Sequence, residues 1–149
     1  MSAAQNQSQP QVLDLSKLGV QELQALHQQL SSELNQFTSS MIALQRTAGK
    51  FASAGQSVEA LKDYKEGQRM MLPMTESLYV PGELSSKDKV LIEIGTGYFV
   101  ERDTEGGIGY CRGKVMEIKE QVGELSRVLQ QRQQVLQRVE GMLAEKAQG

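Results

Sequence analysis

Apolar residues spaced three and four positions apart form a narrow stripe along the first half of the chain. The positions between them are mainly Gln, Ser, Glu, Lys and Thr, so both flanks of the stripe are polar. A stripe of this kind is typical of the seam of a coiled coil, whereas a helix in a globular core has a broader apolar face. The stripe consists of Leu23, Leu26, Leu30, Leu34, Phe37, Met41, Leu44, Ala48, Phe51, Ala54, Val58 and Leu61.

The C-terminal third of the chain carries a second stripe with the same spacing, interrupted once at Arg132. An extra apolar row at Val128, Val135 and Met142 widens this face towards the C-terminus. The three prolines lie outside both stripes. Because proline inside a helix costs about 3 kcal/mol, both stretches are free to form long helices. The second stripe consists of Val115, Ile118, Val122, Leu125, Leu129, Leu136, Val139 and Leu143.

The composition favours exposed helices over a wide compact core. Aromatic residues make up 5% of the chain and Trp is absent, although large aromatics provide much of the burial in globular cores. Gln, a good helix former and a poor strand former, is abundant. The formal charge of −2 does not fit a protein that binds nucleic acid through clustered basic residues.

Between the two stripes the apolar period changes from that of a helix to that of a strand. Residues 78–84 are expected to be extended with a Pro81-Gly82 turn. Residues 90–94 alternate, with Val90, Ile92 and Ile94 predicted to share one face. Gly95-Thr96-Gly97 predicts a turn or a sharp bend between strands, and residues 105–109 predict a second turn region before the last helix.

The predicted fold is mainly α with a small β part: a long antiparallel two-helix coiled coil with two β-hairpins inserted between the helices. Ser16 is the expected N-cap of the first helix, with Asp14 as the competing residue. The first residues are polar and rich in Gln, so we expect a disordered tail there. The predicted bounds are 1–12 for this tail, 13–146 for a single domain (helix 13–68, hairpins 69–109, helix 110–146) and 147–149 for a second tail.

The hairpin region carries more apolar side chains than two small hairpins can bury by themselves. Isolated hairpins are marginally stable in water, and open strand edges invite pairing with other chains. We therefore expect the strands to mediate subunit assembly, the alternative being a self-contained small barrel. The predicted assembly residues are Leu78, Tyr79, Val80, Val90, Leu91, Ile92, Ile94, Tyr98, Phe99 and Val100.

Other candidate chemistry is weak. His27 is predicted to be a solvated helix histidine, because a metal site needs three or four ligands. Cys111 is expected at the start of the second helix, where the helix dipole can activate a thiol, the alternative being an incidental thiol. The phosphate-loop and dinucleotide patterns are both incomplete around residues 107–114. We expect no enzymatic activity, no metal and no cofactor.

Two runs in the hairpin region carry a resemblance to a known family. The segments PMTESLYVPGEL at 73–84 and VLIEIGTGYFVE at 90–101 closely resemble the hairpins of the alpha-type subunits of prefoldin. The most specific parts are the Leu-Tyr-Val-Pro-Gly and Gly-Thr-Gly-Tyr runs within them. The resemblance extends over residues 13–145, although in the helices any coiled coil looks similar.

This resemblance implies a hexamer of two alpha-type and four beta-type subunits. The hairpins of such a hexamer build a double β-barrel platform, from which six coiled coils project. It also implies that the tips of the coils hold non-native actin and tubulin, and that clients pass to the cytosolic group II chaperonin without ATP. The alternative function is that of a coiled-coil scaffold or adaptor subunit of another assembly.

A protein that holds clients needs exposed apolar surface, and both ends of an antiparallel helical pair lie at its tip. Met142 adds an adaptable side chain there. Leu23 and Val139 lie in the seam, and their alternative role is to close the last turns of the coil. The predicted client-binding residues are Leu13, Leu15, Leu18, Val20, Leu23, Val139, Met142 and Leu143.

The sequence also predicts a location. It has one cysteine, no signal-peptide pattern in its first residues, and no apolar run near the roughly twenty residues that span a bilayer. We therefore expect a soluble protein in a reducing compartment that binds neither a membrane nor nucleic acid directly. The resemblance implies the cytoplasm, with the nucleus left open as a further location.

Overall fold

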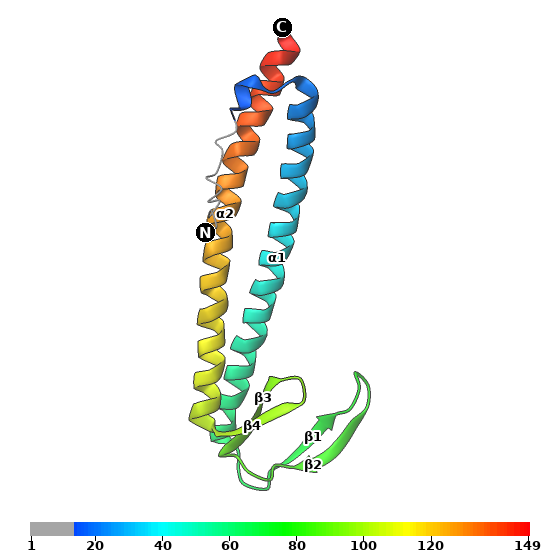
Figure 1. Cartoon of the computed structure of the whole chain (residues 1–149). Coiled ribbons are helices and arrows are strands. Elements are labelled where there is room, and N and C mark those ends of the chain that lie inside the picture. The colour runs from blue at the N-terminus through cyan, green and yellow to red at the C-terminus, as the bar shows by residue number, and fades with distance from the viewer. Residues whose placement is uncertain (1–13) are drawn as a thin grey trace, which may run out of the picture. The chain divides into compact units, whose positions relative to one another are not determined.

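The structure, a computed structural model, describes residues 14–149. Two long helices are separated in the chain by two antiparallel hairpins, so the predicted fold class is confirmed (Figure 1). Each helix contributes to two compact units, one of residues 14–40 and 125–149 and the other of residues 41–124. The elements are η1 (Leu15–Lys17), α1 (Val20–Ala60), η2 (Leu61–Asp63), β1 (Arg69–Pro73), β2 (Tyr79–Glu83), β3 (Lys89–Gly95), β4 (Tyr98–Asp103) and α2 (Thr104–Gln148).

In the first unit, the start of α1 packs antiparallel against the end of α2. Leu23, Leu30 and Val139 form a buried cluster, in which Leu23 and Val139 have no exposed surface. All three belong to the stripes read from the sequence, so the helical period places the seam correctly. The partly buried residues packed against this cluster are Leu15, Leu18, Leu26, Val135, Leu136, Met142 and Leu143.

The first helix begins later than predicted, at Val20 rather than at residue 13. Asp14 caps a short 3₁₀ turn instead, because its carboxylate accepts hydrogen bonds from the backbone N–H and hydroxyl of Ser16 at 3.2 and 2.5 Å. Leu18 is extended, which separates this turn from α1. The Gly19 N–H donates to the Glu22 carboxylate at 2.8 Å, one half of a capping box. Ser16 is therefore not the helix N-cap.

The same helix ends at Ala60, with a 3₁₀ turn over Leu61–Asp63, earlier than the predicted residue 68. Tyr64 is extended and its N–H donates to the Leu61 carbonyl, which closes the last turn. Gly67 has a φ of 70°, a conformation that side chains disfavour and that cannot continue a helix. The chain therefore leaves helical geometry before the glycine and turns there into β1.

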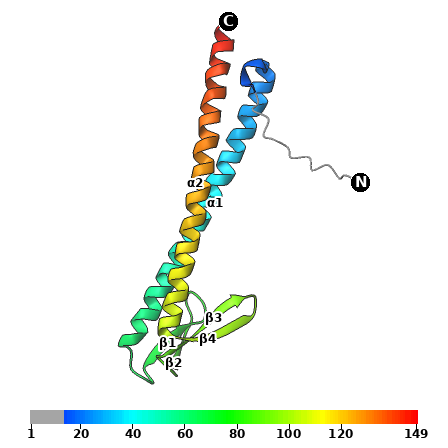
Figure 2. The same ribbon diagram turned by 60° about the vertical axis from the view of Figure 1, so that its left-hand side comes forward.

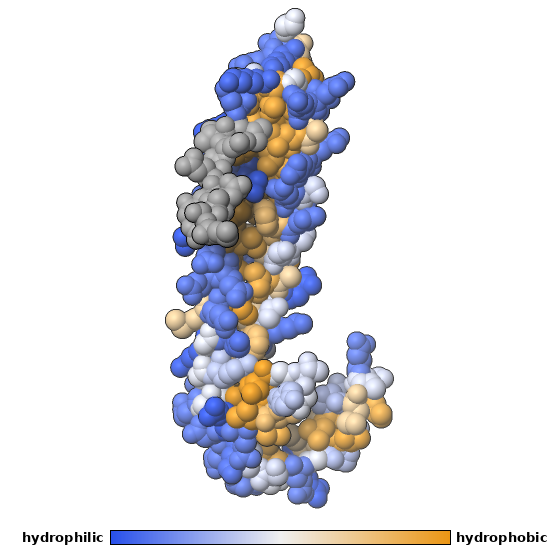
Figure 3. All heavy atoms as spheres, viewed as in Figure 1, coloured by the Kyte–Doolittle hydropathy of each residue, from blue (hydrophilic) through white to orange (hydrophobic). Residues whose placement is uncertain are grey.

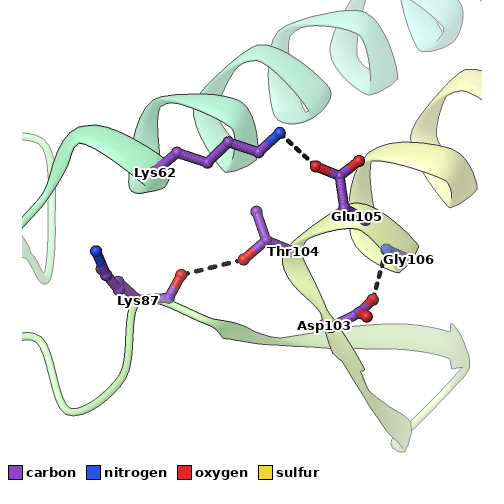
Figure 4. A network of polar contacts seen from close by, with 6 residues as sticks. All are labelled: Lys62, Lys87, Asp103, Thr104, Glu105 and Gly106. Carbon is purple, nitrogen blue, oxygen red and sulfur yellow. Dashed lines mark hydrogen bonds and ion pairs between the residues drawn. The ribbon is translucent and has the colours of Figure 1, made fainter.

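The second helix begins at Thr104, six residues before the predicted start, and absorbs the turn predicted at 105–109. It continues to Gln148, so the tail predicted at 147–149 is wrong for all but the last residue. The Asp103 carboxylate accepts a 2.7 Å hydrogen bond from the Gly106 N–H, as an N-cap does (Figure 4). Thr104, 8% exposed, donates from its hydroxyl to the Lys87 carbonyl at 3.1 Å. These bonds fix the helix start in a sequence whose glycines disfavour helix.

Two glycines in the second unit allow close packing. A Cβ built on Gly107 would lie 2.7 Å from Cγ2 of Val90, so α2 rests directly on β3. A Cβ built on Gly55 would lie 3.2 Å from the Cβ of Cys111, where the two helices approach each other. Cys111 is buried there in the interior of α2, so the prediction that it begins a helix is wrong.

The strands form two separate two-stranded sheets, β1–β2 and β3–β4. Pro81 and Gly82, predicted as a turn, lie inside β2 opposite Met71 and Met70. The turn lies earlier, where the Met74 N–H donates to the Leu78 carbonyl at 2.8 Å. Residues 14–149 contain no sheet that joins the hairpins, so the alternative of a self-contained barrel is wrong for this part of the chain.

The β3–β4 hairpin turns at the predicted glycines, with Gly97 at a φ of 78°. Its register shifts between Glu93 and Gly95. Val90 and Ile92 are half-buried, whereas Ile94 is 60% exposed. Ile94, which lies at this register shift, therefore does not share the partial burial of Val90 and Ile92.

Candidate functional site

The first candidate site is the hairpin surface, defined here as the exposed apolar side chains of residues 69–103. Of fourteen large apolar residues exposed within 14–149, ten lie on it. Figure 3 shows hydrophobic side chains gathered over the hairpins. Ordinary soluble surfaces carry scattered apolar residues, and a concentration such as this one indicates an interaction surface. The ten are Met71, Leu72, Met74, Leu78, Tyr79, Val80, Leu91, Ile94, Tyr98 and Phe99.

Seven of the ten predicted assembly residues belong to the hairpin surface. The other three, Val90, Ile92 and Val100, are half-buried within the chain. Val90 packs against the helices, since the Cβ position of Gly107 lies 2.7 Å from Val90 and 3.4 Å from Val58. Ile92 and Val100 face each other across the β3–β4 ladder. Val90 therefore joins the second hairpin to the helices of its own chain.

Sequence reasoning did not identify three further members of the hairpin surface, namely Met71 and Leu72 of β1 and Met74, which follows that strand. The available signal was the apolar run Met70-Met71-Leu72, which precedes Pro73 and contains no helical spacing. Met side chains are not typical of strands, so local propensity gave no indication of β structure. The strand conformation of Leu72 depends instead on residues of β2. Leu72 pairs with Val80, and its side chain packs on Gly82, where an added Cβ would lie 2.7 Å from Cδ1 of Leu72.

The second candidate site is the coil end, defined as the cluster of Leu23, Leu30 and Val139 with the apolar residues packed on it. Leu23 and Val139 are fully buried within this cluster, the position expected of residues that close the last turns of the coil. Leu15, Leu18, Met142 and Leu143 are half-buried on the rim. Val20 is 44% exposed, and Leu13 lies outside the described residues. The structure thus places seven of the predicted client-binding residues in one compact unit. Their side chains differ in solvent exposure, from fully buried to exposed.

Residues 14–19, called the strap from here on, cover part of the coil end. Figure 1 shows this segment crossing α2 near its C-terminal end, and Figure 2 shows it curling back at the start of α1. Leu15 and Leu18 contact the buried cluster. The Lys146 ammonium donates a hydrogen bond to the Leu18 carbonyl, so the end of α2 holds the strap directly.

Polar pairs join the two helices beside the coil end. Nε2 of His27 lies 3.1 Å from Oε1 of Glu140, and Nη1 of Arg132 lies 3.3 Å from Oε2 of Glu33. The predicted solvated histidine is therefore paired with a carboxylate, and the break in the second stripe is matched by an opposite charge. Within residues 14–149 no group of three His, Cys, Asp or Glu side chains is arranged to hold a metal ion.

At the base of the hairpins, Lys62 of η2 forms an ion pair with Glu105 in the first turn of α2 (Figure 4). This hydrogen bond raises the pKa of the Lys62 ammonium above its ordinary value. A carboxylate in the first turn of a helix also interacts favourably with the helix dipole. The pair therefore joins the end of one helical segment to the start of the other. Over the same described residues, neither helix has an apolar stretch long enough to cross a membrane.

Comparisons with known proteins agree with this architecture. The family model described as Prefoldin subunit matches residues 21–149, so the chain belongs to the prefoldin subunit family. Subunits of this family are non-enzymatic chaperone components. The match covers both helices and both hairpins, and it confirms the resemblance seen in the hairpin segments.

The similar curated proteins carry the name prefoldin subunit 5. A probable prefoldin subunit 5 of Dictyostelium discoideum is 33% identical over 90% of this chain and 83% of its own. Prefoldin subunit 5 of Arabidopsis thaliana is 34% identical over 82% of this chain and 81% of its own. A probable prefoldin subunit 5 of Caenorhabditis elegans is 37% identical over 83% of this chain and 82% of its own.

Among solved structures, the filamentous PFD of Methanocaldococcus jannaschii, determined by cryo-EM, has the same fold. Its TM-score to this chain is 0.50 at 17% identity, covering 85% of this chain and 96% of that one. At this identity the similarity concerns the fold alone. Two helices and intervening hairpins are thus shared between chains whose sequences have largely diverged.

Proposed function

We propose that this chain is an assembly subunit of a hexameric, ATP-independent co-chaperone that holds unfolded proteins. The hexamer would combine it with a second alpha-type and four beta-type prefoldin subunits. Its clients would include non-native actin and tubulin, which it would deliver to the cytosolic group II chaperonin. The proposed location is the cytoplasm, with the nucleus left open.

The observation that carries this proposal is the hairpin surface. Its ten exposed large apolar side chains lie on two separate two-stranded sheets. Two-stranded sheets are marginal in water, and pairing with strands of other chains removes both the open edges and the exposed apolar area. Prefoldin subunits are the partners that family membership suggests.

The apolar rim of the coil end fits the client-holding part of the proposal. Met142 and Leu143 are half-buried, so each keeps some apolar surface accessible. Met is flexible and polarisable, which suits a surface that meets many sequences. Surface at the ends of separate coils is available to a client, whereas the hairpin surface is expected to be occupied by assembly.

One observation favours the alternative of a scaffold or adaptor subunit. Leu23 and Val139 have no exposed surface, so the coil end is closed in this conformation. A scaffold needs no accessible apolar surface there. The two functions predict different effects of polar substitutions in the rim. A scaffold would keep both its partners and its activity, whereas a co-chaperone would keep its partners and bind clients less well.

The test uses the complex that contains this chain. Its native mass should be roughly 100 kDa, which corresponds to six chains of this size in closed symmetry. The complex should suppress aggregation of denaturant-unfolded actin without ATP. Replacing Met142 and Leu143 with Ser should weaken suppression and leave the mass unchanged, whereas Ile42→Ser, at an exposed site on α1, should change neither. Unaltered suppression in the rim variant, or an assembly of folded partners only, would favour the scaffold.

A further inference from the structure

The strap is a locally organised turn rather than a loose extension. Within it, the Asp14 carboxylate accepts from Ser16, the Lys17 N–H donates to the Asp14 carbonyl at 3.1 Å, and the Leu18 N–H donates to the Leu15 carbonyl at 3.3 Å. In the turn that these bonds form, the apolar side chains lie on one side and a charged side chain lies on the other. Leu15 and Leu18 are half-buried against the coil end, while Lys17 is 82% exposed.

The strap occupies the same surface that would serve a client. Leu15 and Leu18 pack on the cluster that contains Leu23 and Val139. If the strap is displaced, the apolar side chains beneath it and the Nζ group of Lys146 become available together. The surface then offers an apolar cluster with a hydrogen-bond donor at its edge, which is suited to a short apolar segment with a free carbonyl oxygen.

The attachment of the strap is suited to reversible opening. Its contacts with the cluster come from two half-buried leucines, and its hydrogen bond to α2 comes from one exposed lysine side chain. Gly19 follows Leu18 directly and precedes the first residue of α1. The strap is thus a separate short element that can leave the coil end while α1 keeps its helix.

We propose that the strap acts as a built-in plug, which mimics an apolar client segment and must be displaced when the coil end binds a non-native polypeptide. The matching client chemistry is two large apolar side chains three positions apart in a turn, as in the Leu15-Ser16-Lys17-Leu18 sequence. This inference rests on the proposed client-holding function. It assigns Leu15 and Leu18 to occlusion of the surface rather than to client contact.

The proposal is tested in the assembled complex by weakening the strap from either side. Lys146→Met removes the donor to the Leu18 carbonyl, and the double variant Leu15→Ser/Leu18→Ser removes the apolar contacts. Only molecules with a displaced strap bind a client, so the closed fraction lowers the apparent affinity of the complex for clients. Both variants reduce that fraction, and we expect the complex to suppress aggregation of unfolded actin at about threefold lower complex concentration. Lys119→Met, a matched change on α2 in the other unit, should leave suppression unchanged.

A second measurement does not depend on client activity. Amide hydrogen exchange at Lys17 and Leu18, whose N–H groups are bonded within the strap, should accelerate in Lys146→Met without any client. In the wild-type complex, exchange at the same amides should accelerate when unfolded actin is added. If the double variant folds poorly, Lys146→Met alone still tests the plug.

The outcomes separate the plug from the proposed function. Weaker suppression in the leucine double variant, with Lys146→Met unchanged, would mean that Leu15 and Leu18 are client contacts and would overturn the plug. Unchanged suppression and exchange in Lys146→Met would also overturn it. A wild-type complex that does not suppress aggregation would instead refute the proposed function, while exchange in Lys146→Met would still show whether the strap opens.

Discussion

Arg132 of α2 lies with its Nη1 3.3 Å from Oε2 of Glu33 on α1, at the position where the apolar stripe of α2 is interrupted. The Glu33 oxygen is buried and accepts no hydrogen bond among the described residues, so the contact is an ion pair without hydrogen-bond geometry. Polar groups at seam positions commonly specify register at some cost in stability. We interpret this pair as a register device between the two helices.

Removing Arg132 should destabilise the coil by leaving the Glu33 carboxylate without its partner. Since both side chains keep partial solvent exposure, Arg132→Ala should lower the free energy of unfolding by about 1 kcal/mol. The double variant Glu33→Leu/Arg132→Leu should melt above the wild type, because an apolar pair fills the seam. Thermal melting of helical circular dichroism measures both. A double variant that melts below Arg132→Ala would contradict this interpretation.

Gly107 and Gly109 provide a matched pair for the packing of α2 on β3. A Cβ at Gly107 would lie 2.7 Å from Val90, whereas a Cβ at Gly109 meets nothing within 4 Å. Gly107→Ala should therefore destabilise the chain by about 1–3 kcal/mol through overpacking. Gly109→Ala should stabilise it by roughly 0.5–1 kcal/mol through helix propensity.

Chemical denaturation of the two alanine variants gives the comparison directly. Adding Val90→Ala to Gly107→Ala should restore part of the lost stability, since it removes the methyl group that the new Cβ meets. If both single variants shift stability in the same direction, α2 does not rest on β3 as closely as the structure indicates.

The hairpin surface should control assembly and not the fold of the chain. Leu91 and Phe99 are 69% and 60% exposed, so Leu91→Ser/Phe99→Ser should leave the helical signal unchanged while the native mass of the complex falls. Ile42→Ser, at a residue 51% exposed on α1, is the control and should leave the mass intact. Native mass spectrometry of the complex measures this, and a full-sized complex with the double variant would exclude these strands from the interface.

The strap should loosen in acid. Hydrogen bonds from the Ser16 hydroxyl and backbone N–H, the largest causes, hold the pKa of the Asp14 carboxyl below its ordinary value of 3.8. A lowered pKa means that the ionised carboxylate stabilises the folded turn above the ordinary value, and that this stabilisation disappears as pH falls through the folded pKa.

Asp14→Asn removes the charge at every pH, and amide exchange at Ser16, corrected for intrinsic rates, measures the effect. At neutral pH this amide should exchange faster in the variant than in the wild type. The two should converge as pH falls through the folded pKa of Asp14, which lies below the ordinary value. An equal difference between them at all pH values would show that the charge does not organise the strap.

The sequence determined the two helices, their antiparallel seam, the turn at Gly95–Gly97 and the dominance of apolar residues in the hairpin region. These features follow from periodicity and from glycine conformation, which depend on residues close together in the chain. Leu23, Leu30 and Val139 were identified as seam residues for this reason, and they are the buried centre of the coil end.

The tertiary structure decided where helices begin and end, which apolar residues remain exposed, and where the strap lies. The start of α2 depends on contacts of Thr104 with the Lys87 carbonyl and of Gly107 with Val90. The strap depends on Lys146, which lies 128 positions from Leu18 in the chain. Local propensity does not specify contacts between residues so far apart in the chain. Such contacts contribute free energy only after folding has brought the two residues together.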